Sequence, residues 1–294
     1  MSKNGKRAIL ITGASSGIGR AAALAFDGAG YRVFAGVRRE TDGQALRQHA
    51  SARLQPLILD VHVTEHIVAA RTLLDREGSL FALINNAGHN YVAPFEATDW
   101  NKARALMETN LFGLATLTQA MIPLLRANAS RKRATHIVNV SSIGGLIGIP
   151  WEPWYHASKF ALIGLSESLR HELRRQHIAV SVVCPGGIKT PFIAKSREEA
   201  DSAARALNAE HQALYGPSMQ RLSSLTQAVA GAGSDPETVA RVMKRILTTN
   251  RPRFLNLVGG DAATMLTLKR WLPAPAFHAL MRGVFTDAAS PRER

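Results

Sequence analysis

A tyrosine and a lysine stand four residues apart in the segment Tyr155-His156-Ala157-Ser158-Lys159. On a helix this spacing places the phenol and the ammonium on one face, one turn apart. A phenol with its reference pKa of about 10 is almost wholly protonated at neutral pH, and lowering that pKa by about three units takes about 4 kcal/mol. One ammonium about 4 Å away supplies about that much at an effective dielectric constant of about 20. The pair can therefore exchange a proton with a bound group without a metal.

Other polar residues that could complete such a site lie upstream of this pair. Ser142 follows the apolar run His136–Val140 and precedes a Gly144-Gly145 turn. Asn85-Asn86-Ala87-Gly88 follows another apolar run, and Asn110 lies in a segment of helical period. Each has a plain structural explanation by itself, because a buried Asn is usually a hydrogen-bonded structural residue and a Ser-Ser pair usually forms a turn.

A glycine-rich turn, Thr12-Gly13-Ala14-Ser15-Ser16-Gly17-Ile18-Gly19, lies between the apolar run Ala8–Ile11 and the helical run Arg20–Phe26. Glycines in this setting let backbone N–H groups approach a pyrophosphate at the positive end of a helix. The spacing differs from G-x-G-x-x-G, and no Lys-Ser/Thr pair follows the last glycine, which argues against a kinase or an ATPase. The turn predicts a dinucleotide site.

The choice of dinucleotide depends on the end of the second apolar run, Ala35-Gly36-Val37-Arg38-Arg39. In NAD sites an acid about 20 residues after the glycines binds the ribose hydroxyls, and no carboxylate stands here. The guanidinium of Arg38 can pair with a 2′-phosphate. These residues favour NADP(H), with NAD and a merely solvent-exposed arginine as the alternatives.

Seven short apolar runs alternate with segments of helical period, as in a doubly wound α/β fold with a parallel seven-stranded sheet of the Rossmann type. Ligands in such sheets bind at the carboxyl ends of the strands, where the polar residues above stand. A capping sequence, Ser234-Asp235-Pro236-Glu237, predicts a helix over residues 239–247. The predicted strands are Ala8–Ile11, Arg32–Val37, Leu57–Leu59, Leu80–Ile84, His136–Val140, Ile178–Val183 and Phe254–Val258.

The domain organisation we predict is one catalytic domain over residues 6–260 and a helical extension over 261–294. Residues 191–233 form an Ala-rich stretch without strand signal and read as an insertion over the carboxyl edge of the sheet. The extension carries an apolar stripe on two helical segments split by Pro273 and Pro275. We expect this stripe to pack on its own domain or on a partner subunit. A peripheral membrane contact through Lys269, Arg270 and Arg282 is the alternative.

The composition excludes several classes of protein. The chain has 294 residues, of which 46% are hydrophobic, with a single cysteine and a net charge of +14. These values rule out a disordered chain and an intrachain disulfide. Basic residues are scattered, and the densest clusters, at 131–133 and 170–175, lack the interleaved aromatics of a nucleic-acid platform, so we expect no nucleic-acid partner. No secretory signal and no transmembrane span are visible, and we expect a cytoplasmic protein.

One motif points to a metal and is rejected. The segment His62-Val63-Thr64-Glu65-His66 matches H-x-x-E-H, which binds zinc when both histidines lie on one helix. Thr64 has the properties of an N-cap, so His62 is expected in the preceding loop. We predict no metal site, and we expect Cys184, at a strand end before Pro185, to be a small buried residue.

Taken together and in this order, TGxxxGxG, NNAG, Asn110, Ser142, Tyr155-x-x-x-Lys159 and Pro185-Gly186 resemble the short-chain dehydrogenase/reductase family over about residues 6–260. The resemblance implies Tyr155 as general acid or base and Lys159 as its electrostatic activator and a ribose ligand. It implies Ser142 as the hydroxyl that orients a carbonyl and Asn110 as the holder of a water. The cofactor-binding residues it implies, with Arg38 added from the argument above, are Gly13, Ser15, Ser16, Gly17, Ile18, Gly19, Arg38, Asp60, Val61, Asn86, Ala87, Gly88, Tyr155, Lys159, Pro185, Gly186, Ile188 and Thr190.

The same resemblance gives a first hypothesis about the substrate. The residues around the tyrosine are similar to those of family members that act on steroids, retinoids or other lipophilic alcohols and ketones. Aromatic and aliphatic residues could line an apolar pocket, namely Trp151, Pro153, Trp154, Phe192, Ile193 and Met219. Family members commonly form dimers or tetramers through the segments that correspond to Leu106–Arg126 and Tyr155–Gln176. The alternative hypothesis is a non-catalytic protein that only senses the dinucleotide. This hypothesis does not explain why Ser142, Tyr155, Lys159 and Asn110 are all present.

Overall fold

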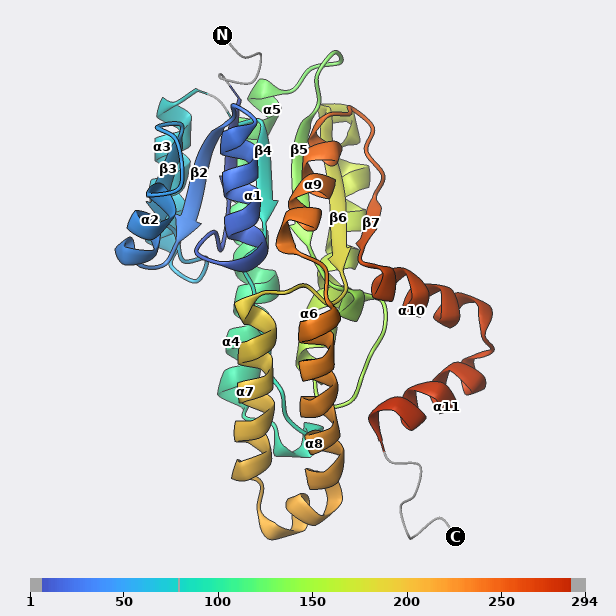
Figure 1. Ribbon diagram of the computed structural model, residues 1–294. Coiled ribbons are helices and arrows are strands. Elements are labelled where there is room, and N and C mark those ends of the chain that lie inside the picture. Colours follow the sequence, from blue (N-terminus) through green and yellow to red (C-terminus); the bar gives the residue numbers. More distant parts are fainter. Residues whose placement is uncertain (1–6, 79, 287–294) are drawn as a thin grey trace.

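A seven-stranded parallel sheet forms the centre of the computed structural model, which describes residues 7–78 and 80–286 (Figure 1). The strand order is β3-β2-β1-β4-β5-β6-β7, and every neighbouring pair is parallel. This confirms the predicted doubly wound fold class. The strands are β1 (Ala8–Ile11), β2 (Arg32–Val37), β3 (Leu54–Ile58), β4 (Ala82–Asn85), β5 (Thr135–Val140), β6 (Ile178–Pro185) and β7 (Leu255–Val258).

The third strand lies further upstream than predicted, over Leu54–Ile58 instead of Leu57–Leu59. Gln55 and Pro56 interrupt its apolar run and conceal it in the sequence. Pro56 is tolerated because β3 is an edge strand, where a missing N–H removes no ladder hydrogen bond. The fourth strand begins two residues later than predicted, at Ala82, and the sixth extends to Pro185.

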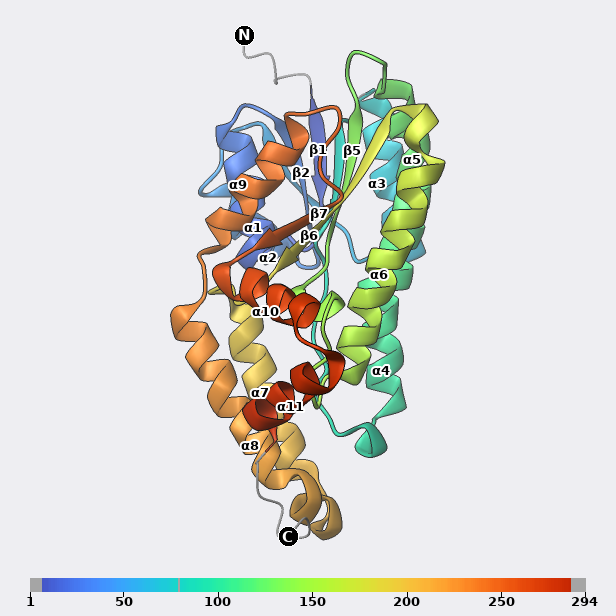
Figure 2. The same ribbon diagram turned by 90° about the vertical axis from the view of Figure 1, so that its right-hand side faces the viewer.

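Helices cover both faces of the sheet (Figure 2). Successive strand residues point to opposite faces, so Ile9 and Ile11 pack on one side and Ala8 and Leu10 on the other. The first face is covered by α1 (Gly17–Gly28), α2 (Glu40–Arg47) and α9 (Pro236–Leu247), and the second by α3 (Thr64–Arg76), α5 (Gly113–Asn128) and α6 (Pro153–Glu172). Helix α9 confirms the prediction from the capping sequence.

Short helical segments lie in the connections between the strands. They are η1 (Phe95–Ala97), α4 (Trp100–Met107), the π-helical η2 (Glu108–Phe112), η3 (Ile143–Gly145) and η4 (Arg174–Gln176). Residues 191–233 form two helices, α7 (Pro191–Ala206) and α8 (Ala209–Ala232), which pack on each other and project beyond the carboxyl ends of the strands (Figure 1).

The C-terminal segment forms two helices, α10 (Gly260–Trp271) and α11 (Ala274–Phe285). The predicted split falls at Pro273, while Pro275 lies in the first turn of α11. Phe277 and Met281 are buried against Ile147, so much of the apolar stripe packs on the chain's own domain. Trp271 is 79% exposed at the end of α10. The last eight residues of the predicted extension lie outside the described residues. None of the helices described is long and apolar enough to span a membrane.

Candidate active site

The glycine loop has a backbone that other residues would strain. Gly13 and Gly17 have φ angles of +64° and +53°, in the left-handed region. Gly19 has an ordinary φ, but a Cβ there would lie 2.2 Å from the Gly13 carbonyl oxygen. The first turn of α1 contains no acidic residue, and Ser15 and Ser16 are exposed beside it. The loop therefore presents the positive end of a helix, unblocked, as an anion such as a pyrophosphate requires.

The loop lies at the point where the strand order reverses, between β1 and β4. The buried Thr12 hydroxyl accepts hydrogen bonds of 2.9 Å from the backbone N–H groups of both Asn86 and Ala87. The Asn86 side chain in turn donates to the carbonyl oxygens of Thr12 and Gly13. The two strand ends are thus locked together at the position where open α/β sheets bind ligands.

Thr190, in the segment that follows β6, contacts the glycine loop that follows β1. A Cβ at Gly17 would lie 3.0 Å from the Thr190 Cγ2 atom, so the segments around residues 17 and 190 are in contact. Backbone hydrogen bonds between residues 187–189 and Ser234 hold the Ile188 segment in place. The residues predicted from the resemblance after β1, β4 and β6 therefore gather at one edge.

Asp261 fixes the turn after Pro185 and was not predicted. Its carboxylate accepts a 2.6 Å hydrogen bond from the Gly187 N–H, and a Cβ at Gly186 would lie 2.3 Å from both carboxylate oxygens. No sequence motif links the two residues, which lie 74 positions apart in the chain. A side chain at position 186 would therefore displace the Asp261 carboxylate from this contact.

The two arginines after β2 differ in their partners. The Arg39 guanidinium makes two hydrogen bonds with Asp42, at 3.0 and 2.9 Å. Arg38 is exposed and makes no side-chain hydrogen bond or ion pair within residues 7–78 and 80–286. Arg38 is therefore the one of the two whose guanidinium is available to a phosphate.

Asp60 and Val61 follow β3, next to the H-x-x-E-H segment that was rejected as a metal motif. The Asp60 side chain accepts from the His62 N–H, and its own N–H donates to His66 Nδ1. Val63, and not Thr64 as predicted, caps α3, since the helix begins one residue earlier. His62 lies outside the helix as expected and contacts the Thr109 hydroxyl, so the two histidines have different partners.

Tyr155, Lys159 and Ser142 meet at the carboxyl end of β5. Tyr155 and Lys159 are both buried on α6, and the Lys159 Nζ atom lies 5.7 Å from the centre of the Tyr155 ring. Lys159 also donates a 3.1 Å hydrogen bond to the Val140 carbonyl oxygen. Burial lowers the pKa of Lys159 to about 8, so the ammonium keeps most of its charge at neutral pH.

The pKa of Tyr155 differs from the expectation. Burial raises it above its ordinary value, and a hydrogen bond with the Ser142 side chain acts in the opposite direction. Burial is the largest of these effects, because desolvation disfavours the charged phenolate. The phenol therefore holds its proton at neutral pH.

The neighbouring Cys184 is buried, as expected, and burial raises its pKa to about 12.

Asn110 lies in the π-helical turn η2, a local distortion that often marks functional sites. Its side-chain amide donates to the His89 carbonyl oxygen and to Ser158 Oγ, and its oxygen accepts from the His89 N–H. A Cβ at Gly88 would lie 3.1 Å from Asn110 Oδ1 and 3.3 Å from Lys159 Nζ. The glycine thus lets the loop after β4, η2 and α6 converge.

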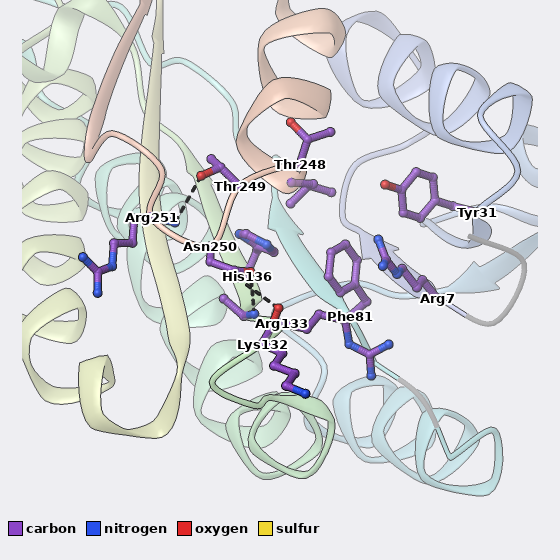
Figure 3. A pocket seen from close by; sticks show the side chains of 12 residues that line it. Arg7, Tyr31, Phe81, Lys132, Arg133, His136, Thr248, Thr249, Asn250 and Arg251 are labelled. Atoms are coloured by element: carbon purple, nitrogen blue, oxygen red, sulfur yellow. Dashed lines mark hydrogen bonds between the residues drawn. The ribbon is translucent and has the colours of Figure 1, made fainter. Parts of the chain in front are cut away.

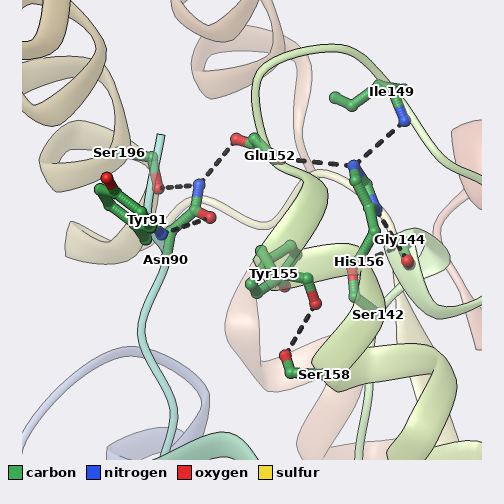
Figure 4. A network of polar contacts seen from close by, with 10 residues as sticks. All are labelled: Asn90, Tyr91, Ser142, Gly144, Ile149, Glu152, Tyr155, His156, Ser158 and Ser196. Carbon is green, nitrogen blue, oxygen red and sulfur yellow. Dashed lines mark hydrogen bonds and ion pairs between the residues drawn. The ribbon is translucent and has the colours of Figure 1, made fainter. Parts of the chain in front are cut away.

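A buried polar network beside Tyr155 was not predicted (Figure 4). Asn90 donates to Glu152 Oε1 at 2.7 Å and to Ser196 Oγ at 3.2 Å, which links the loop after β4 to α6 and α7. His156 bonds to the Gly144 carbonyl oxygen through Nδ1 and accepts from the Ile149 N–H through Nε2. These partners, and a pKa lowered by burial, indicate a neutral imidazole.

Glu152 gives this network a pH dependence, because burial raises its pKa from 4.5 to about 7. In the unfolded chain the carboxyl ionises near 4.5, so its contribution to stability is full below that pH and is lost as the pH rises through 7. Relative to Glu152→Gln, we expect the wild type to lose about 3 kcal/mol of unfolding free energy between pH 4.5 and 8. Denaturant unfolding at each pH measures this difference.

The exposed Glu167, on the same helix, provides the matched control. Glu167→Gln should follow the wild type across this pH range, since it removes a solvated carboxylate. Parallel curves for the wild type and Glu152→Gln would show that Glu152 ionises freely in the folded protein.

Tyr155 packs in an apolar cluster with Tyr91, Ala93, Ala103 and Leu106, from the loop after β4 and from α4. The Phe192 ring centre lies 5.9 Å from that of Tyr155. Met219 is buried with Val92, and Trp151 packs on that cluster. Trp154 packs on the Tyr155 cluster instead and also contacts the rings of Phe95 and Trp100. The expected lining residues are therefore divided between two clusters, with Phe192 in contact with the tyrosine.

The sheet order and the glycine loop at its switch point define a dinucleotide-binding protein of the Rossmann type. The sequence model of the family described as short chain dehydrogenase matches residues 7–201. The chain therefore belongs to the short-chain dehydrogenase/reductase family, and it is an oxidoreductase of that family.

Relatives match along almost the whole chain. Identity is 30% with the 3-ketodihydrosphingosine reductase of Bacteroides thetaiotaomicron, over 90% of this chain and 93% of the relative. It is also 30% with retinol dehydrogenase 5 of Homo sapiens, over 96% and 89%. A solved short-chain dehydrogenase from Streptomyces avermitilis superimposes with a TM-score of 0.74 at 30% identity, covering 98% of this chain and 100% of that one.

Proposed function

We propose that this protein is an NADP(H)-dependent oxidoreductase that interconverts a lipophilic alcohol and its ketone or aldehyde. The observation that carries the proposal is the meeting of Tyr155, Lys159 and Ser142 at the strand edge that also holds the glycine loop. The loop fits the cofactor, because its glycines leave room for a pyrophosphate beside the free end of α1. When bound, the nicotinamide exchanges a hydride with the substrate carbon.

In this mechanism Ser142 orients the carbonyl oxygen and Tyr155 donates the proton to it. The buried phenol holds that proton at neutral pH, which suits the reduction direction. Lys159 stabilises the phenolate that forms and binds the ribose. Asn110 holds the loop after β4 against α6. We also assign to Asn110 the binding of a water molecule, through which Tyr155 regains the proton that it has donated. In alcohol oxidation, the phenolate accepts the proton instead.

The test of this function is the oxidation of NADPH against a panel of lipophilic ketones, aldehydes and quinones. We expect turnover with at least one carbonyl of this class and a preference for NADPH over NADH. The relatives named above are a sphingoid-base reductase and a retinol dehydrogenase, which supports the choice of panel. Tight dinucleotide binding without turnover on any compound would favour the sensor reading.

Arg38 is expected to determine the preference for NADP(H). Arg38→Gln removes a charge-assisted hydrogen bond to the 2′-phosphate, worth about 1.5 to 3 kcal/mol. The Kd for NADP⁺ should therefore rise about 10- to 100-fold, with little change for NAD⁺. Isothermal titration measures both without a substrate. Arg39→Gln is the matched control, because Arg39 already pairs with Asp42. A larger effect in the control would assign the phosphate to Arg39.

We further propose that the protein is cytoplasmic and forms a homodimer or homotetramer through α5 and α6. Phe112, just before α5, and Phe160 on α6 are 52% and 43% exposed, which supports a partner on this face. The alternative is a peripheral membrane contact, for which the surface would be formed by Trp271, Lys269 and Arg270. Lys269 already donates to the Leu146 carbonyl oxygen, which weighs against it.

A further inference from the structure

An open cleft of about 830 Å³ lies at the amino ends of the strands, at the opposite edge of the sheet from Tyr155 (Figure 3). Its walls come from residues just before β1, β4 and β5 and from the 247–251 segment between α9 and β7. This volume is within the range of small-molecule sites and much larger than a single inorganic ion needs. Nothing in the proposed reaction uses this cleft.

The charged side chains that line the cleft all have the same sign. Arg7, Lys132, Arg133 and Arg251 contribute four positive charges, and no acidic residue lines it among the described residues. Lys132, Arg133 and Arg251 form no ion pair within that part of the chain. Like charges that converge on one concave surface raise the local concentration of anions. The cleft therefore favours a ligand with several negative charges.

His136 supplies a second and independent observation. The side chain is 1% exposed and lines the cleft, yet its Nδ1 atom has no hydrogen-bond partner among the described residues. Figure 3 shows the ring between Phe81 and the segment of residues 248–251. A buried polar atom without a partner costs about 1 to 3 kcal/mol. A ligand oxygen in the cleft would remove this cost.

The cationic segments are held in place rather than loose. Asn250 accepts from the Ala134 N–H at 2.9 Å and donates to the Lys132 carbonyl oxygen at 3.1 Å, which ties the loop before β5 to the loop before β7. The Arg7 guanidinium lies 4.9 Å from the centre of the Phe81 ring. Each contact fixes the backbone or side chain of a basic residue at the wall. The backbone that carries the basic residues is therefore fixed at the wall of the cleft.

The aromatic residues at the floor of the cleft already pack against one another. Tyr31 stacks on Phe81 with ring centres 6.1 Å apart, and His136 meets Phe81 edge-on at 5.2 Å. Tyr31, Phe81 and His136 are each at most 4% exposed, so among the described residues of the cleft no aromatic ring offers a face on which a nucleobase could stack. Recognition in the cleft rests on charge and hydrogen bonds. This distinguishes it from a surface that binds single-stranded nucleic acid, which needs stacking platforms.

We propose that this cleft is a second ligand site, which binds a small phosphorylated polyanion through Arg7, Lys132, Arg133 and Arg251, with His136 as a hydrogen-bond partner. The phosphate groups pair with the guanidinium and ammonium groups. Such a ligand can be an inorganic polyphosphate or an organic polyphosphate, since both present the same oxygens. The site is separate from the dinucleotide site, because the two lie at opposite edges of the sheet.

Isothermal titration of the full chain with inorganic tripolyphosphate tests the proposal, with and without saturating NADP⁺. We expect one tripolyphosphate per chain in both conditions. The double variant Arg133→Gln/Arg251→Gln should weaken binding at least tenfold, with an unchanged circular dichroism spectrum. The Nδ1 resonance of His136 should shift on binding, a readout that a general loss of surface charge does not produce. Replacing the probe with an organic polyphosphate distinguishes the two sources by affinity.

Two exposed arginines outside the cleft are the controls. Arg175→Gln changes a basic residue in η4, and Arg104→Gln changes one in α4; both variants should bind tripolyphosphate as the wild type does. No binding at millimolar probe would overturn the proposal, as would equal weakening by Arg175→Gln or competition by NADP⁺. Tighter binding of a short single-stranded RNA than of tripolyphosphate, sensitive to the double variant, would overturn it in favour of a nucleic-acid surface.

Discussion

Tyr155→Phe is expected to lower kcat for carbonyl reduction by about a thousandfold, within the range that general acid–base catalysis contributes. The variant removes only the hydroxyl, and therefore only the proton that the carbonyl oxygen needs. The ring keeps its packing with Phe192 and the cluster around Leu106. Steady-state kinetics at 340 nm and dinucleotide titration should show a loss in kcat with a nearly unchanged Kd for NADPH.

Tyr31→Phe is the matched control, since it removes a hydroxyl from a buried tyrosine at the opposite edge of the sheet. Its kcat should equal that of the wild type. Retention of more than a tenth of the wild-type kcat by Tyr155→Phe would mean that another group supplies the proton. A loss of NADPH binding instead of turnover would make Tyr155 a binding residue.

Gly19→Ala is expected to damage the dinucleotide loop severely. The added methyl would lie 2.2 Å from the Gly13 carbonyl oxygen and 2.5 Å from Asn86 Nδ2, so the backbone of the loop has to move. Overpacking of this kind costs about 1 to 3 kcal/mol. We expect a Kd for NADP⁺ at least tenfold higher and a lower melting temperature, by about 2 to 4 °C for each kcal/mol in a chain of this size.

Gly28→Ala provides the same substitution at the other end of α1, where a Cβ would meet nothing within 4 Å. This variant should bind NADP⁺ as the wild type does and gain up to about 1 kcal/mol of stability, because alanine favours a helix over glycine. If the two alanine variants behave alike, the loop has room at Gly19 and the close approach to Gly13 is not a constraint.

The sequence predicted the sheet and the carboxyl-edge gathering of polar residues because both depend on local patterns. Uninterrupted apolar runs such as Ala8–Ile11 mark buried parallel strands, and parallel strands bring their ends to one edge. Strand β3 was misplaced because Gln55 and Pro56 break its pattern. An edge position tolerates both residues, but the strand's place in the sheet is not visible in its own residues.

Contacts between distant segments could not be predicted in the same way. Asp261 reaches the Gly187 N–H across 74 residues, and Asn90 reaches Ser196 across 106. Neither residue belongs to a motif, and their polar types suit loops and helix starts equally well. The effect of burial on the pKa of Tyr155 could not be predicted either, since it depends on how far the surrounding elements desolvate the phenol.

In the proposed reaction, hydride moves between NADPH and a lipophilic carbonyl that Tyr155 protonates. The most direct measurement uses NADPH deuterated at C4 of the nicotinamide, on the transferred face, with a ketone that the panel identifies. Mass spectrometry of the alcohol formed by the wild type should show one deuterium on the carbinol carbon. Tyr155→Phe should form almost none of this alcohol. An alcohol without deuterium, or equal yields from both proteins, would contradict the account.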